Sequence, residues 1–194
     1  MKSHGDGAPS EWITRWAHLM PERGSVLDVA CGAGRHVRWL HALGHAVTGV
    51  DRSQEALAPL ATLQPPVETV CVDIESGPWP LAGRQFGAVI VTNYLWRPLL
   101  PTLIASVAPG GVLLYETFAA GNETVGRPAR PEFLLAPGEL LGACEGLRTV
   151  AFEDGWLASP ERFVQRIAAV REQHGAAASR HPLVPQGAAA RQAP

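Results

Sequence analysis

The first chemistry-bearing segment of the chain is a glycine turn that follows a short apolar run. The run over residues 26–30 leads into Gly32 and Gly34, and an acid, Asp28, stands four positions before the first glycine. Glycines let a backbone approach a ligand closely, and the free N–H groups of a helix starting after Gly34 favour a polar ligand. A carboxylate at this position suits a cationic amino group. We therefore predict a loop that binds an amino-acid-bearing nucleoside.

Two further acids close the next two apolar runs. Asp51 ends the run over residues 45–51, and Asp73 ends the third run just before Ile74. An acid about 20 residues after such a loop recurrently accepts hydrogen bonds from ribose hydroxyls. Asp73 can accept from the exocyclic amine of adenine while Ile74 packs on the ring. Because parallel strands end at one edge of a sheet, we expect the three acids to meet there.

Other ligands fit this pattern less well. Val37 stands where a dinucleotide-binding fingerprint needs its third glycine, and the Gly-Lys-Ser/Thr of a phosphate-binding loop is absent, which disfavours NAD and nucleoside triphosphates. His36, His41 and His45 do not predict a metal site, because Gly44 is expected to end the helix before the last of them.

Candidates for the acceptor side of the site follow the fourth and fifth runs. An acid at the end of a central strand, Glu116, must either face the cleft or find a partner. Arg97 either pairs with a substrate anion or caps local carbonyls, and Arg127 and Arg130 either meet substrate or remain solvated. We take as candidate catalytic residues Asn93, Tyr94 and Glu116, and as candidate substrate-binding residues Arg97, Arg127 and Arg130.

The elements that must position these residues alternate along the chain. Apolar runs over residues 25–30, 45–51, 67–74, 86–93 and 110–118 are separated by helical patterns over 35–43, 53–63 and 95–107. This alternation predicts an α/β, doubly wound, mostly parallel sheet with helices on both faces. Two β-like stretches, 147–156 and 161–171, predict a terminal hairpin that brings the sheet to seven strands, with the last strand antiparallel.

The remaining segments predict the domain organisation. We expect residues 1–9 to be a flexible N-terminus, 10–171 a single domain that opens with a short helix after Ser10, and 172–194 a disordered tail. The connection over residues 119–137 is long and rich in Gly and Pro. Such loops are usually functional, and we expect it to close over the acceptor side as a lid.

Composition excludes several classes of protein. The 194 residues carry a net charge of −2 without any Lys/Arg block, which lacks the electrostatic footprint of nucleic-acid binding. Three widely spaced cysteines form neither a disulfide framework nor a zinc cage, and no apolar run has the length of a signal or membrane span. We expect a cytoplasmic protein that acts on a small molecule and contacts neither membrane nor nucleic acid. The sequence does not indicate an oligomeric state.

Five segments together resemble the class I S-adenosylmethionine-dependent methyltransferases. They are, in the family's order over residues 26–171, VLDVACGAGRH, VTGVDRS, CVDIESGPWP, FGAVIVTNYLWRPLLP and LIASVAPGGVLLYETF. The subtype most similar to this chain is the group of small bacterial methyltransferases related to the tellurite-resistance enzyme. Asn93-Tyr94-Leu95-Trp96 departs from the Asn/Asp-Pro-Pro-Tyr/Phe signature of amino-directed methylases, which argues against base methylation.

The resemblance implies S-adenosylmethionine as cofactor and S-adenosylhomocysteine as product. It places four groups of residues around the cofactor: Asp28, Ala30, Gly32 and Gly34 at the methionine part, Asp51 and Arg52 at the ribose, Asp73 and Ile74 at the adenine, and Asn93 beside the sulfonium. Arg35 is a further candidate cofactor-binding residue. Ala30 stands where the family often has Gly. The implied reaction is methyl transfer to a small-molecule acceptor by in-line displacement. The alternatives are a protein or RNA methyltransferase and a non-catalytic S-adenosylmethionine-binding regulatory module.

Overall fold

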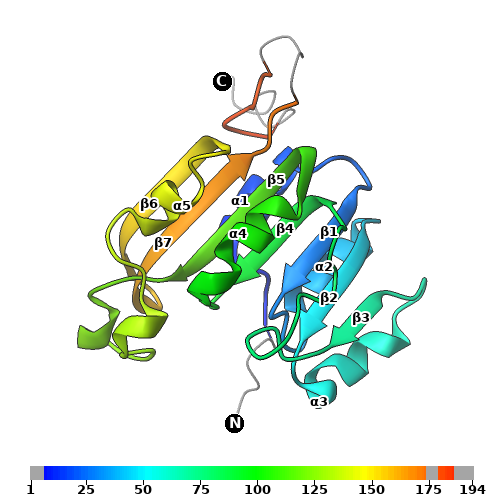
Figure 1. The fold of residues 1–194 in the computed structure, drawn as a ribbon, viewed down its shortest axis with the longest axis horizontal. Coiled ribbons are helices and arrows are strands. Elements are labelled where there is room, and N and C mark those ends of the chain that lie inside the picture. The colour runs from blue at the N-terminus through cyan, green and yellow to red at the C-terminus, as the bar shows by residue number, and fades with distance from the viewer. Residues whose placement is uncertain (1–6, 174–178, 186–194) are drawn as a thin grey trace, which may run out of the picture.

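The computed structural model describes residues 7–173 and 179–185, which form one seven-stranded sheet with helices on both faces (Figure 1). The strand order is β3-β2-β1-β4-β5-β7-β6. The strands are β1 (Ser25–Val29), β2 (Ala46–Asp51), β3 (Glu68–Cys71), β4 (Phe86–Thr92), β5 (Val107–Phe118), β6 (Arg148–Ala158) and β7 (Glu161–Val170). β7 alone runs antiparallel to both of its neighbours, β5 and β6. The predicted fold class is thus confirmed, including the terminal hairpin.

The helices lie where the sequence predicts them but are shorter. They are α1 (Glu11–Trp16), α2 (Arg35–Ala42), α3 (Gln54–Leu57), α4 (Leu100–Ala105) and α5 (Glu139–Ala143), and short 3-10 turns extend several of them. The turns are η1 (Ala17–Leu19), η2 (Ala58–Thr62), η3 (Arg97–Leu99), η4 (Asn122–Thr124) and η5 (Pro131–Phe133). Prolines explain part of the shortening: Pro59, Pro98 and Pro101 stand near the starts of η2, η3 and α4.

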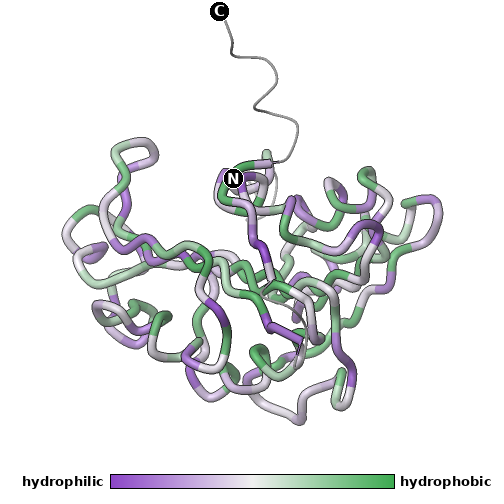
Figure 2. The backbone as a smooth tube through the Cα atoms, turned by 90° about the horizontal axis from the view of Figure 1, so that it is seen from above, coloured by the Kyte–Doolittle hydropathy of each residue, from purple (hydrophilic) through white to green (hydrophobic). Residues whose placement is uncertain are grey.

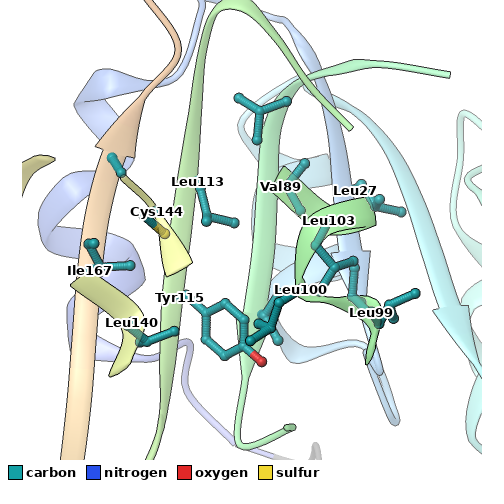
Figure 3. Close-up of a cluster of buried hydrophobic side chains, with 14 of the residues drawn as sticks. Leu27, Val89, Leu99, Leu100, Leu103, Leu113, Tyr115, Leu140, Cys144 and Ile167 are labelled. Carbon is teal, nitrogen blue, oxygen red and sulfur yellow. The ribbon is translucent and has the colours of Figure 1, made fainter. Parts of the chain in front are cut away.

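Two apolar clusters pack on opposite faces of the sheet. On one face, α4 and α5 cover β4, β5 and β7, and Figure 3 shows the Tyr115 ring lying between Leu140 and Leu100. On the other face, α1, α2 and α3 cover the sheet with Trp12, Leu40 and Leu57. Figure 2 shows the hydrophobic stretches running along the strands at the centre of the molecule. Both faces of the central strands are therefore buried, as a doubly wound sheet requires.

The chain reverses its direction of winding between β1 and β4, which are neighbours in the sheet although β2 and β3 follow β1 in sequence. Open α/β sheets bind ligands at such a switch point, outside the carboxyl ends of the strands. In Figure 1 this is the lower edge of the sheet, along which the described N-terminal residues also run before they enter α1.

The ends of the chain lie partly outside the described residues. The predictions of a flexible N-terminus and a disordered tail fall in part on residues 1–6, 174–178 and 186–194, which the structure does not describe. Within the tail, the carbonyl of Pro182 lies 2.9 Å from Nε2 of His18, so residues 179–185 contact η1. Among the helices of the described residues, none has the length and apolar composition needed to cross a bilayer.

Gly34 and Gly44 allow a matched test of the turn before α2. Both have positive φ (+76° and +85°), but a Cβ at Gly34 would lie 2.6 Å from Leu60, whereas a Cβ at Gly44 would meet nothing within 4 Å. We expect Gly44→Ala to reduce the free energy of unfolding by about 1 kcal/mol from backbone strain alone. Gly34→Ala should reduce it by about 1–3 kcal/mol more, because Leu60 is fully buried and must shift. Urea denaturation measures both, and equal losses would contradict the predicted close contact.

Candidate functional site

The loop between β1 and α2 curls back against β2. Ala30, Gly32 and Gly34 all have left-handed backbones, with φ of +52°, +55° and +76°. The Gly32 N–H donates a 2.7 Å hydrogen bond to Asp51 Oδ2, and the Cys31 N–H donates to the Val50 carbonyl at 3.0 Å. A left-handed backbone explains why glycine is favoured at position 30, since an L side chain in this conformation costs about 1–2 kcal/mol.

A cavity of about 250 Å³ opens at the carboxyl edge beside this loop. Its lining comes from five separate parts of the chain: Ala30, Asp51, Arg52, Val72, Asp73, Ile74, Glu75, Tyr94 and Phe133. Five of the predicted cofactor residues are thereby brought together, namely those at positions 30, 51, 52, 73 and 74. Asp28, Gly32, Gly34, Arg35 and Asn93 lie on the elements around the cavity but not in its lining.

Asp51 is held in one orientation by two backbone groups. Its Oδ2 accepts from Gly32, and its Oδ1 accepts from the Ser53 N–H at 2.9 Å. Each carboxylate oxygen can accept a further hydrogen bond, so the side chain remains able to receive hydroxyl groups from a ligand. Asp73 lies two residues beyond the end of β3 and is exposed, and its Oδ1 accepts from the Glu75 N–H.

Asp28 is buried on β1 with its carboxyl group next to α2. Its side chain is 1% exposed, and within the described residues its Oδ2 has no hydrogen-bond partner. Burial raises the pKa of Asp28 to about 7, an effect that Arg35 opposes. A buried carboxyl oxygen without a partner fits the amino group of an amino-acid ligand, which supports the predicted role of Asp28 at the methionine end of the cofactor.

His36 and Ser10 fasten the N-terminal segment to this region. Burial lowers the pKa of His36 to about 3, so the ring is neutral. Its Nε2 accepts a 3.0 Å hydrogen bond from the Ser10 N–H, which assigns the ring proton to Nδ1, 3.8 Å from Asp28 Oδ2. The Ser10 hydroxyl donates to Glu116 Oε1 at 3.1 Å. The segment before α1 is therefore held at the same edge as the cavity.

Glu116 forms ion pairs within the fold and does not line the cavity. It is 1% exposed, and its carboxylate lies 3.2 Å from Arg166 Nε and 3.5 Å from Arg162 Nη2. The geometry favours the second of the two roles that the sequence allowed for it, an acid that pairs within the fold. Its contacts join β5, β7 and the N-terminal segment.

Asn93 and Tyr94 follow β4 and lie in different surroundings. Asn93 is exposed, has φ of +54°, and donates its N–H to the Glu116 carbonyl at 2.9 Å. Tyr94 lines the cavity, and its carbonyl accepts from the Tyr115 hydroxyl at 2.8 Å. Burial raises the pKa of Tyr94, so the phenol is a neutral donor at physiological pH.

The three arginines predicted to bind substrate also differ. Arg97 donates to both carboxylate oxygens of Glu139 and to the carbonyls of Glu132 and Leu134, which is the carbonyl-capping role. Arg127 and Arg130 are exposed on the long connection after β5. The Arg130 guanidinium lies over the Phe133 ring, 4.6 Å from its centroid.

Val72, Glu75 and Phe133 line the cavity but were not predicted from the sequence. Val72 and Glu75 flank Asp73 and Ile74, so their place follows from the predicted adenine contact. Phe133 lies in the loop over residues 119–137, whose sequence has no periodicity, and the placement comes from η5 and from a bridge between Ala119 and Leu135. No sequence signal distinguishes this aromatic residue.

Comparison with known proteins shows what part of this chain is similar to. Residues 26–111 match the family described as a methyltransferase domain. The match covers less than half of the chain and identifies this segment as similar to methyltransferase domains. The crystal structure of TehB from Haemophilus influenzae superposes on this chain with a TM-score of 0.60 at 22% identity, covering 77% of this chain and 58% of TehB. At this identity the likeness to TehB concerns the fold.

Two curated relatives match part of this chain. Trans-aconitate 2-methyltransferase of Delftia acidovorans is 35% identical over 97 residues, which are 45% of this chain and 35% of the relative. Malonyl-[acyl-carrier protein] O-methyltransferase of Serratia marcescens is 32% identical over 103 residues, 50% of this chain and 39% of the relative. The chain thus spans less than two-fifths of the length of either relative in these matches.

The buried pair Asp28 and His36 predicts two opposing effects of pH on stability. In the folded protein the pKa of Asp28 lies above its ordinary value of 3.8. Its contribution to the free energy of unfolding is therefore lost as the pH rises from about 4 to about 7. His36 has a folded pKa below its ordinary value of 6.5, so its contribution grows as pH rises from about 3 to 6.5. Each has a slope of about 1.4 kcal/mol per pH unit, and the two nearly cancel between about pH 4 and 6.5.

Removing one partner should expose the other slope. Relative to the wild type, His36→Gln should make the free energy of unfolding fall by about 1 kcal/mol per pH unit between pH 4.5 and 6.5, and Asp28→Asn should make it rise by a similar amount. Urea denaturation at three pH values measures these slopes, with His41→Gln at the other end of α2 as the control. Parallel slopes in all four proteins would show that the two buried groups do not titrate as stated.

Proposed function

We propose that this protein binds S-adenosylmethionine in the cavity at the carboxyl edge and transfers its methyl group to a small-molecule acceptor. The observation that carries the proposal is the cavity itself. Its lining combines Ala30 after β1, Asp51 and Arg52 at the end of β2, and Asp73 and Ile74 after β3. These are residues that the family resemblance places around the ribose, the adenine and the start of the methionine part.

The chemistry of each residue fits a part of the cofactor. Asp51, oriented by two N–H donors, presents acceptors for the ribose hydroxyls. Asp73 presents an acceptor for the adenine amine, while Ile74 offers an apolar surface to the ring. Asp28, buried beside the loop after β1, has a carboxyl oxygen without a hydrogen-bond partner in the part of the chain that the structure describes, and we assign it to the amino group of the methionine part. The cavity is lined by both polar and apolar groups, as a site for a nucleoside requires.

When bound, S-adenosylmethionine supplies an electrophilic methyl group, which the acceptor takes by in-line displacement to leave S-adenosylhomocysteine. The protein contributes mainly proximity and orientation, which can account for a large part of the acceleration. Tyr94 is a neutral phenol at the cavity, so it can donate a hydrogen bond but is unsuited to remove a proton from the acceptor. An anionic acceptor needs no general base.

The names of the curated relatives support a small, carboxylate-bearing acceptor. One is named for trans-aconitate, and the other for the malonyl group of an acyl-carrier protein. Both groups carry carboxylates, and an ionised carboxylate oxygen is already the nucleophile that methyl transfer needs. The exposed arginines 127 and 130 on the loop after β5 supply positive charge that such an acceptor can approach.

Cofactor choice can be tested by ligand-induced stabilisation. S-adenosylhomocysteine should raise the Tm of the wild type by an amount that grows with its concentration, whereas NAD should leave the Tm unchanged. Asp51→Ala should weaken S-adenosylhomocysteine binding by about 1–3 kcal/mol in calorimetry, because the ribose loses a charged acceptor. Asp51→Asn keeps one oxygen and should lose less. A Tm shift with NAD alone, or an unchanged Kd in Asp51→Ala, would sink the assignment.

The proposed lid can be tested apart from the cofactor site. Asn122 should be kept, because its side chain is buried and its Oδ1 accepts from the Phe163 N–H. Replacing residues 124–129 with Gly-Gly removes the exposed part of the loop and leaves the cavity lining in place. Turnover should fall at least tenfold, while the Kd of S-adenosylhomocysteine changes less than threefold, because a lid orients the acceptor and excludes water.

Turnover is measured as S-adenosylhomocysteine release with a panel of small carboxylates as acceptors. Unchanged turnover in the shortened protein would show that the loop has another role.

A further inference from the structure

Phe133 brings an aromatic ring to the cavity from a part of the chain far from its other walls. The remaining lining residues lie between positions 30 and 94, on the loops that follow β1 to β4. Phe133 ends η5 in the connection between β5 and α5 and is half-buried. An aromatic ring in the wall of a nucleoside pocket offers a flat surface on which a purine can stack.

Arg97 grips the backbone on both sides of Phe133. Its Nη1 donates to the carbonyl of Glu132 at 2.8 Å, and its Nη2 donates to the carbonyl of Leu134 at 2.7 Å. One rigid guanidinium therefore spans the two peptide carbonyls that bracket Phe133. The planar guanidinium has several N–H donors in fixed directions and can bind both carbonyls at once, whereas the compact ammonium of a lysine lacks this geometry.

Arg97 is itself held in place by Glu139 at the start of α5. Its Nε lies 2.6 Å from Oε1 and its Nη2 lies 2.9 Å from Oε2, a bidentate pair. This pair lowers the pKa of Glu139 and raises that of Arg97, so both remain charged. Glu139 Oε2 also accepts from the Ala136 N–H at 2.8 Å. Arg97 and Glu139 together therefore bind the backbone at positions 132, 134 and 136. Arg97 begins η3, three residues after Tyr94, so this part of the loop is attached to the chain that follows β4.

The Phe133 ring also has a cationic neighbour. The Arg130 guanidinium lies over the ring at 4.6 Å from its centroid, and Arg130 Nε lies 3.4 Å from Glu132 Oε1. A cation over one face of a ring favours a fixed ring orientation. Two arginines therefore contact this part of the loop: Arg97 binds the backbone beside Phe133, and Arg130 packs on the Phe133 ring.

We propose that Phe133 forms an aromatic wall for the purine of the bound cofactor and that Arg97 is the positioning residue that holds Phe133 there. The proposal deepens the proposed function and rests on it, because it assigns a further part of the same site. According to this proposal, the affinity for the cofactor depends on the loop after β5. The sequence alone predicts only that this loop closes over the acceptor side. It also gives Arg97 a role through Phe133 instead of direct contact with a substrate anion.

The test is a mutant cycle with S-adenosylhomocysteine as the probe in calorimetry. Phe133→Ala should weaken binding about tenfold, and Phe133→Tyr, which keeps the ring, should bind within about twofold of the wild type. Arg97→Ala should weaken binding about five- to tenfold. The double variant should bind no more weakly than Phe133→Ala alone, because Arg97 acts through a ring that is no longer present.

Controls separate this role from a general loss of stability. Trp156→Ala truncates an exposed aromatic residue on β6, and Arg148→Ala removes an arginine that pairs with Glu172; neither lines the cavity, and both should keep the wild-type Kd. Arg97→Lys keeps the charge without the fork and should weaken binding even if Arg97→Ala fails to fold. All titrations are run well below the Tm of each variant.

Adenosine serves as a second probe, because it lacks the methionine part. The losses in Phe133→Ala and Arg97→Ala should be the same fold-change with adenosine as with S-adenosylhomocysteine. If the wild type binds neither probe, the proposed function fails. If the wild type binds but Phe133→Ala retains its Kd, the aromatic wall is refuted and the proposed function stands. If the losses of the two single variants add in the double variant, or if Arg97→Lys binds like the wild type, Arg97 does not position Phe133.

Discussion

The hydrogen bond from the Gly32 N–H to the Asp51 carboxylate joins the turn after β1 to the end of β2, where the proposed cofactor site lies. At 2.7 Å it closes the turn after β1 onto the end of β2. The turn can approach this closely only because three residues within five positions have left-handed backbones. The start of α2, the orientation of Asp51 and the mouth of the cavity all follow from this contact. The same carboxylate thus shapes the loop and remains available to a ligand.

Buried polar groups continue from this contact across the sheet. Asp28 on β1, His36 on α2, Ser10 before α1 and Glu116 on β5 are all at most 8% exposed. Each burial is unfavourable by itself and is offset by a neighbour: Ser10 bonds both His36 and Glu116, and Arg166 approaches Glu116. Asp28, whose Oδ2 lacks a hydrogen-bond partner among the described residues, lies beside the loop of the proposed cofactor site, where a charged ligand can supply the missing hydrogen bond.

The sequence predicted correctly those features that depend on residues close together in the chain. Alternating apolar runs and helical patterns predicted the seven strands, their class and the terminal hairpin, because strand burial and crossover handedness restrict the topologies. Asp51, Asp73 and Ile74 were predicted from their positions at strand ends, and the cavity includes all three. The sequence left two possible environments for each of Glu116 and Arg97, contact with a ligand or contact with other parts of the fold. It could not decide between them, because the partners within the fold lie far away in the sequence. Arg166, Glu139 and the carbonyls around Phe133 become neighbours only in the folded chain.

The contacts of the N-terminal segment also constrain the order in which the chain can fold. Ser10 bonds Glu116, 106 residues later, and the Trp12 indole donates to the Ile167 carbonyl, 155 residues later. During synthesis, the first helix is made long before the strands that receive it, so it cannot dock until β7 has left the ribosome. Until then Trp12, Ile13 and Trp16, all buried in the folded protein, lack their native cover. The nascent chain therefore carries an apolar segment until β7 has been made, which is the kind of surface that chaperones bind.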